Sequence, residues 1–207
     1  MFAAVTSKEN ALPAKLISVI GPPAVGKTTL AELLANELPA ELIREDYAGN
    51  PFLADSYLGR DEARLPAQIS YLMSRVRQLS AVCRPQEGLA VSDYGFCQDG
   101  LYARMRLSAR DFGIYERIAA RLAPVVHSRD MIIHLDASVP LLLDRLAARG
   151  RAFERGMDAE FISAMRQGYN EIARMAECPI IPINCDEVDI LEATWRGRLL
   201  GRIRTGL

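Results

Sequence analysis

The segment from Gly21 to Thr28 carries the clearest chemical signal in the sequence. Its residues, GPPAVGKT, match the pattern G-x-x-x-x-G-K-[ST]. Glycine at both ends lets the backbone curl until successive N–H groups point inward at phosphate oxygens. Lys27 is placed to reach the β- and γ-phosphates, and the Thr28 hydroxyl can ligate Mg²⁺. The pattern predicts a site for ATP and Mg²⁺ formed by Gly21, Ala24, Val25, Gly26, Lys27, Thr28 and Thr29.

Two carboxylates follow short apolar segments and are the candidates for further chemistry. Glu45 comes shortly after Leu42–Ile43, and Asp93 comes shortly after Leu89–Val91. The carboxyl ends of parallel strands meet at the edge of a sheet where ligands bind, so both side chains should lie beside the phosphate loop. Glu45 is then placed to accept the proton of an attacking hydroxyl group, and Asp93 to contact Mg²⁺ or that hydroxyl.

The elements that must position these residues alternate along the chain between strand-like and helix-like patterns. This alternation predicts an α/β fold of the P-loop kinase type, a three-layer α/β/α sandwich with a parallel sheet of about five strands. We expect a loose lead-in over residues 1–14 and a single domain over residues 15–207. The expected strands are 16–20, 42–43, 89–91, 131–135 and 180–183, and the expected helices are 28–38, 63–83, 109–123, 139–149, 158–176 and one from about Val188.

Composition narrows the classes of function. The formal net charge is −1, which gives no global field for nucleic acid or for an anionic membrane, so neither is an expected partner. The four cysteines form no C-x-x-C pair. No apolar stretch approaches the roughly 20 residues that cross a bilayer, and the first residues do not resemble a secretory signal. We expect a cytoplasmic protein.

Beyond the phosphate loop, the sequence resembles the deoxynucleoside kinases, most closely their bacterial deoxyadenosine/deoxyguanosine kinase-like branch. The resemblance runs from residue 16 to about residue 170 through segments in the family's order. Glu45 precedes Asn50-Pro51-Phe52 by five residues, and Tyr57 stands eleven residues before Gln68. Two further segments complete it: Ser92-Asp93-Tyr94, and Arg145-x-x-x-Arg149-Gly150-Arg151-x-x-Glu154.

The resemblance implies a reaction and a role for each matching residue. ATP would phosphorylate the 5′-hydroxyl of a deoxynucleoside, with Glu45 as the base. Gln68 would read the nucleobase, and Tyr57 and Glu154 would hold the sugar 3′-hydroxyl. Arg149 and Arg151, in a lid over residues 149–157, would meet the charge of the transferring phosphoryl group. Members of the family are commonly homodimers, and helices 63–83 and 109–123 are the candidate interface.

The sequence departs from the family pattern at two positions. Asp46 stands where the family usually has proline, and Tyr94 stands where many relatives have an arginine that steadies the catalytic carboxylate. Arg75, on the predicted helix 63–83, is the candidate for that task. It could pair with Glu45 or Asp93, or it could help to orient the base.

Other functions fit part of the pattern. A nucleoside monophosphate kinase, such as thymidylate kinase, shares the phosphate loop and an arginine lid but usually has arginine where Tyr94 stands. A P-loop switch or motor ATPase pairs the phosphate loop with an aspartate at the end of an apolar strand, and Leu135-Asp136 could fill that place. No water-positioning glutamine follows it. The sequence does not show which nucleobase the acceptor carries. It also assigns no role to the basic C-terminal segment RGRLLGRIRTGL.

Overall fold

The computed structural model describes residues 15–80, 88–126 and 130–207, and the expected lead-in over residues 1–14 lies outside these ranges. Five strands form one parallel sheet in the order β2-β3-β1-β4-β5. This confirms the predicted α/β fold with a parallel sheet. The strands are β1 (Lys15–Ile20), β2 (Glu41–Ile43), β3 (Leu89–Ser92), β4 (Met131–Asp136) and β5 (Ile180–Asn184).

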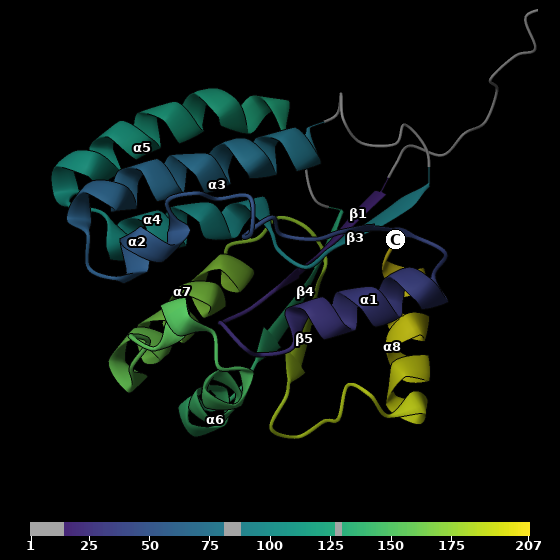
Figure 1. Ribbon diagram of the computed structural model, residues 1–207. Helices are drawn as coiled ribbons and strands as arrows, with labels where there is room; N and C mark the ends of the chain where they lie inside the picture. The colour runs from purple at the N-terminus through teal and green to yellow at the C-terminus, as the bar shows by residue number, and fades with distance from the viewer. Residues whose placement is uncertain (1–14, 81–87, 127–129) are drawn as a thin grey trace, which may run out of the picture.

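Helices cover both faces of the sheet (Figure 1). Alternate residues of a strand point to opposite faces, so the central strand β1 sends Ile17 and Val19 to one side and Leu16 and Ile20 to the other. Because both faces are covered, β1 and β4 are almost uniformly apolar and buried. On the face of Ile17, the sheet packs against α1 (Lys27–Glu37), α6 (Val139–Arg149) and α8 (Ala193–Gly206).

The opposite face carries a larger group of helices. They are α2 (Leu53–Tyr57), α3 (Arg64–Leu79), α4 (Asp99–Arg106), α5 (Ala109–Leu122) and α7 (Ala159–Arg174). In Figure 1, α5 lies alongside α3 and forms the outermost part of this group. Single-turn helices cover Asp61–Ala63, Phe96–Gln98, Ala123–Val125 and Ala152–Glu154. Within the described ranges, no helix has the length and apolar character that a membrane span requires.

Three expectations about helices need correction. The last helix begins at Ala193 rather than near Val188, because the Glu192 carboxylate caps it by accepting from the backbone N–H groups of Thr194 and Trp195. The long helix ends at Leu79, before the predicted residue 83, and residues 81–83 lie outside the described ranges. Helices α2 and α4 were not expected, because five and eight residues are too few to show a clear helical period.

The strand order brings the candidate residues to one edge of the sheet. The phosphate loop follows the central strand β1, Asp93 follows β3, and Glu45 lies two residues beyond β2. Strands β2 and β3 are neighbours, and β3 is a neighbour of β1. The two carboxylates predicted to flank the loop therefore lie on the same side of it. Residues 185–191, which follow β5, lie beyond β4 on the other side.

Candidate active site

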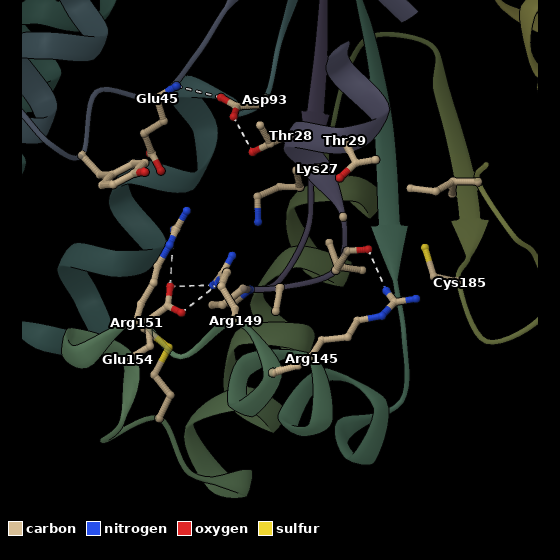
Figure 2. A pocket seen from close by; sticks show the side chains of 18 of the residues that line it. Lys27, Thr28, Thr29, Glu45, Asp93, Arg145, Arg149, Arg151, Glu154 and Cys185 are labelled. Atoms are coloured by element: carbon tan, nitrogen blue, oxygen red, sulfur yellow. Dashed lines mark hydrogen bonds and ion pairs between the residues drawn. The ribbon is translucent and has the colours of Figure 1, made fainter. Parts of the chain in front are cut away.

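One large cavity opens at this edge of the sheet, with a volume of about 910 Å³. Its middle is the phosphate loop, and Figure 2 shows Lys27 projecting into it. Apart from Gly21, all residues predicted for the site line this cavity, which brings together six separate stretches of the chain. They are Ala24, Val25, Gly26, Lys27, Thr28, Thr29, Glu45, Tyr57, Gln68, Arg75, Asp93, Arg149, Arg151 and Glu154.

The phosphate loop has the conformation that its glycines allow. Gly21 has φ 147°, and a Cβ atom there would lie 2.2 Å from the Leu135 carbonyl oxygen, so only glycine fits against β4. Gly26 has φ 111° and directly precedes α1. Because α1 starts at the floor of the cavity, its unpaired N–H groups and the positive end of its dipole face the space where phosphates would bind.

Lys27 is folded back onto its own loop. Its Nζ atom donates to the backbone oxygens of Gly21 and Pro22, both at 2.8 Å. Burial lowers the Lys27 pKa from 10.5 to about 8, although the negative charges of Glu45 and Asp93 oppose this shift. A triphosphate bound in the cavity would place further negative charge beside the Lys27 ammonium group and offset the cost of burying it.

Asp93 connects the phosphate loop to the segment that carries Glu45. One carboxylate oxygen accepts from the Thr28 hydroxyl at 2.6 Å, and the other accepts from the Glu45 backbone N–H at 2.7 Å (Figure 2). The side chain is almost fully buried, and this burial raises its pKa above the usual value despite the two hydrogen bonds. Asp93 therefore fixes the relative positions of Thr28 and Glu45.

Thr28 and Asp93 together offer oxygen ligands for Mg²⁺. A hydroxyl and a carboxylate lie side by side at the phosphate loop, and Mg²⁺ prefers oxygen ligands. Within the described ranges, no cluster of three or more histidine, cysteine, aspartate or glutamate residues could hold a metal ion by itself. In proteins, Mg²⁺ is usually held by one or two protein groups together with substrate phosphates and water.

Arg75 lies beneath Glu45 and joins it to a buried carboxylate that the sequence did not reveal. One end of the guanidinium group pairs with Glu45 and the other with Asp99, whose side chain is 1% exposed. Asp99 also accepts from Gln68 at 3.1 Å and from the Tyr115 hydroxyl at 2.6 Å. Of the two carboxylates expected as partners of Arg75, the structure pairs it with Glu45. The Gln68 amide N–H₂ group is engaged by Asp99.

Tyr94 explains why this arginine comes from α3. The Tyr94 side chain is fully buried in the core, and its hydroxyl donates to Gln78 at 2.8 Å. A phenol carries no positive charge, so Tyr94 cannot supply a cation to Glu45, and Arg75 on α3 supplies it instead. Asp99 gave little signal in the sequence, since a single acid in a stretch such as GFCQDGLYA is usually exposed.

The arginines of the predicted lid are held by Glu154. Arg149 makes a two-pronged contact with this carboxylate, with distances of 2.9 and 2.5 Å, and Arg151 lies 3.6 Å from it (Figure 2). The Arg151 guanidinium group also lies over the Tyr47 ring, 4.5 Å from its centre. These contacts place two cations at the cavity wall near Lys27, Glu45 and Glu154.

Arg145 belongs to the other side of the cavity. Its guanidinium group donates to the Val25 carbonyl oxygen at 3.0 Å. Next to it lie Cys185 and the loop to Leu191, which completes this wall. The cavity thus extends in two directions from the phosphate loop, toward Gln68 and Tyr57 on one side and toward residues 185–191 on the other.

Sequence reasoning missed an aromatic group on the Gln68 side. The rings of Tyr47, Tyr71 and Tyr102 line the cavity together with Tyr57, and Arg106 lies beside them. Tyr71 lies one helical turn after Gln68, a spacing that could have indicated a shared face. Tyr102 and Arg106 lie on α4, which was not expected, so their position could not be inferred.

Comparison with known proteins agrees with this geometry. The family model for deoxynucleoside kinase matches residues 17–205. Deoxyguanosine kinase from Bacillus subtilis (strain 168) is 29% identical over 159 residues, which cover 75% of this chain and 77% of that protein. Deoxyadenosine/deoxycytidine kinase from the same organism is 27% identical over 194 residues, 89% of each chain. Deoxyadenosine kinase from Dictyostelium discoideum is 28% identical over 187 residues, 87% of this chain and 76% of that one.

Solved structures show the same fold. Deoxyadenosine kinase from M. mycoides with dCMP and dCDP bound has a TM-score of 0.79 at 19% identity, covering 92% of this chain and 98% of that chain. The same kinase with bound dATP has a TM-score of 0.77, also at 19% identity, covering 92% and 99%. The family match spans nearly the whole chain and includes the phosphate loop, Glu45 and the arginine lid. The chain therefore belongs to the deoxynucleoside kinase family and is an ATP-dependent phosphotransferase.

Proposed function

We propose that this enzyme transfers the γ-phosphate of Mg²⁺-ATP to the 5′-hydroxyl of a purine deoxynucleoside, with Glu45 as the general base. The observation that carries the proposal is the two-sided cavity with Lys27 and Thr28 at its centre and Glu45 on one side only. ATP would lie with its base toward residues 185–191, and the acceptor would lie toward Gln68. The γ-phosphate and the acceptor hydroxyl would then meet between Lys27 and Glu45.

Each reacting group has a residue suited to it. As the 5′-oxygen forms its bond to the γ-phosphorus, its proton passes to a Glu45 carboxylate oxygen, and the bond to the bridging oxygen of ADP breaks. Arg75 and the Gln98 amide, 3.4 Å from Glu45, orient the carboxylate. Bound Mg²⁺, held by Thr28 and Asp93, would neutralise charge on the β- and γ-phosphates.

The lid arginines are suited to the transferring group. A phosphoryl group in flight spreads negative charge over three oxygens, which planar guanidinium groups match well. Arg149 and Arg151 are now paired with Glu154, and a bound triphosphate offers them a stronger anion. Residues 149–157 would close over the site and exclude water, which limits hydrolysis of ATP. Glu154 would then hold the sugar 3′-hydroxyl together with Tyr57.

The nucleobase would lie among the tyrosines, with Gln68 and Arg75 at its polar edge. Arg75 donates to Asp99 as well as to Glu45, so the base end and the catalytic carboxylate share one buried network. The three curated relatives are named for deoxyguanosine, for deoxyadenosine, and for deoxyadenosine with deoxycytidine. Their names make purine deoxynucleosides the expected acceptors.

A phosphotransfer assay tests this function. The enzyme is incubated with ATP, Mg²⁺ and each of the four deoxynucleosides, with thymidine monophosphate as a parallel acceptor. Turnover highest with deoxyadenosine or deoxyguanosine supports the proposal. Transfer to thymidine monophosphate alone would assign a monophosphate kinase activity instead. Hydrolysis of ATP without phosphate transfer to any of these acceptors would favour a switch or motor ATPase.

We also infer a cytoplasmic homodimer. Within the described ranges, Cys178 and Cys185 carry thiols outside any disulfide, as is usual in a reducing compartment. Among exposed side chains, α3 contributes Met73 and the adjacent helix α5 contributes Ile114 and Ile118, with exposures of 49%, 42% and 36%. A second copy packing on these helices would cover this apolar surface. Sedimentation of wild type and of Ile118→Glu should give a dimer and a monomer, respectively; a monomeric wild type would refute the inference.

A further inference from the structure

Tyr57, proposed to hold the sugar 3′-hydroxyl, lies at the end of a weak element. Helix α2 has only five residues, Leu53–Tyr57, and an isolated helix of this length does not persist in water. A hydroxyl that must meet one substrate atom therefore depends on other parts of the fold to hold it. The required support comes from Arg106, in the last turn of α4.

Arg106 contacts both the backbone and the ring at the end of α2. One guanidinium nitrogen donates to the Ser56 carbonyl oxygen at 2.8 Å and lies 3.2 Å from the Ser56 hydroxyl. The carbon of the guanidinium group lies 3.6 Å from the centre of the Tyr57 ring. Ser56 is itself buried, and its hydroxyl donates to the Leu53 carbonyl oxygen at 2.7 Å. The cation thus fixes the chain and the ring plane together.

The charge of Arg106 also acts on the phenol. A cation over an aromatic face is attracted to the ring, and its positive charge favours the ionised phenolate over the neutral phenol. Burial raises the Tyr57 pKa, and the positive charge of Arg106 is the largest influence that opposes this rise. The Tyr57 O–H group is therefore a stronger hydrogen-bond donor than it would be in the same pocket without the arginine.

We propose that Arg106 is a positioning residue that aims the Tyr57 hydroxyl at the acceptor's 3′-hydroxyl and so sets the preference for substrates that carry this group. The proposal rests on the acceptor site described above. Tyr57 and Arg106 line both the main cavity and an adjoining cavity of about 210 Å³. Their stack therefore lies at the boundary between the two spaces, where a shift of the ring would move the hydroxyl away from the sugar.

The test compares two substrates that differ only at the 3′ position. They are the deoxynucleoside with the highest turnover and its 2′,3′-dideoxy counterpart, and the readout is the ratio of their kcat/KM values. Arg106→Met should lower this ratio by about tenfold, the scale of one well-made hydrogen bond, because the 3′-hydroxyl loses an aligned donor. Arg106→Lys keeps the charge without the planar fork and should recover part of the ratio.

Arg104 offers a matched control on the same helix. Its guanidinium group also lies over an aromatic ring, 5.4 Å from the centre of Phe112, but it does not line the main cavity. Arg104→Met should leave the substrate ratio at the wild-type value. In a Tyr57→Phe background, Arg106→Met should have no further effect on the ratio, since no hydroxyl remains to be positioned.

The outcomes separate the proposal from its foundation. If Arg106→Met lowers kcat/KM equally for both substrates, the arginine is merely structural and the proposal is wrong. If Tyr57→Phe lowers the ratio but Arg106→Met does not, the acceptor site stands and only the role of Arg106 fails. If Tyr57→Phe itself leaves the ratio unchanged, Tyr57 does not hold the 3′-hydroxyl, and both assignments fall.

Discussion

Replacing Lys27 with methionine should change how the stability of the ligand-free enzyme depends on pH. In the folded protein, burial lowers the Lys27 pKa from 10.5 to about 8. Below pH 8 the side chain is charged in both the folded and the unfolded states, so the full cost of burying the charge is present. Between pH 8 and 10.5 the unfolded chain keeps its proton while the folded protein loses it, and the wild type becomes more stable as the pH rises.

The size of the effect follows from the two pKa values. The lowering from 10.5 to about 8 corresponds to about 3 kcal/mol of folding free energy below pH 8, falling to about 1 kcal/mol at pH 10. Methionine keeps most of the side-chain volume and has no charge. It also loses the two hydrogen bonds to Gly21 and Pro22, which changes the stability at all pH values but leaves the slope. The stability of Lys27→Met relative to wild type should therefore fall by about 2–3 kcal/mol between pH 7 and 10.

Urea unfolding without nucleotide at pH 7, 8, 9 and 10 measures this difference. All other titratable groups are the same in both proteins, so their contributions to the pH dependence largely cancel. Lys15→Met removes the same formal charge at the start of β1, outside the cavity lining, and serves as the control. If the difference in the free energy of unfolding between Lys27→Met and wild type stays constant from pH 7 to 10, the cavity does not disfavour the Lys27 ammonium ion.

Two further substitutions test the network around the catalytic carboxylate. Glu45→Gln should lower kcat by about 10²- to 10⁴-fold while ATP still binds, because the amide cannot accept the proton. Steady-state kinetics and nucleotide titration measure the two effects. A variant with wild-type kcat would show that Glu45 is not the base. Arg75→Met leaves buried Asp99 without its cation, so the free energy of unfolding should fall by about 3–5 kcal/mol, measured in urea at pH 7. Arg77→Met, an exposed arginine on the same helix, is the control, and an equal loss there would contradict the argument.

Local patterns were sufficient for the sheet and the phosphate loop. An apolar run such as Leu16–Ile20 followed by GPPAVGKT predicts a strand, a turn and a helix within a few residues, and the structure has all three. Hydrophobic periodicity predicted the long helices, because the apolar residues of each recur at helical spacing on its buried face. Boundaries were less certain where a cap decides them, as at Glu192 before α8.

Residues whose role comes from distant partners were harder to find. Asp99 is recognisable only beside Arg75, Gln68 and Tyr115, which lie 16–31 residues away from it in the chain. Arg106 acquires its contact with Tyr57 because α4 packs near α2, and neither helix was expected from the pattern. A short helix and a single charged residue carry too little local information to be read from the sequence.

The sequence by itself determined the parallel α/β fold, the phosphate loop and the family, because these depend on residue types at short spacing. It also supplied Glu45 and Asp93 as strand-end carboxylates. Only the tertiary structure decided which partners these groups have: Asp93 joins Thr28 to Glu45, and Arg75 joins Glu45 to Asp99. The reason is physical. Hydrogen bonds and ion pairs act over a few ångströms, and the distances between remote residues are set only when the helices pack against the sheet.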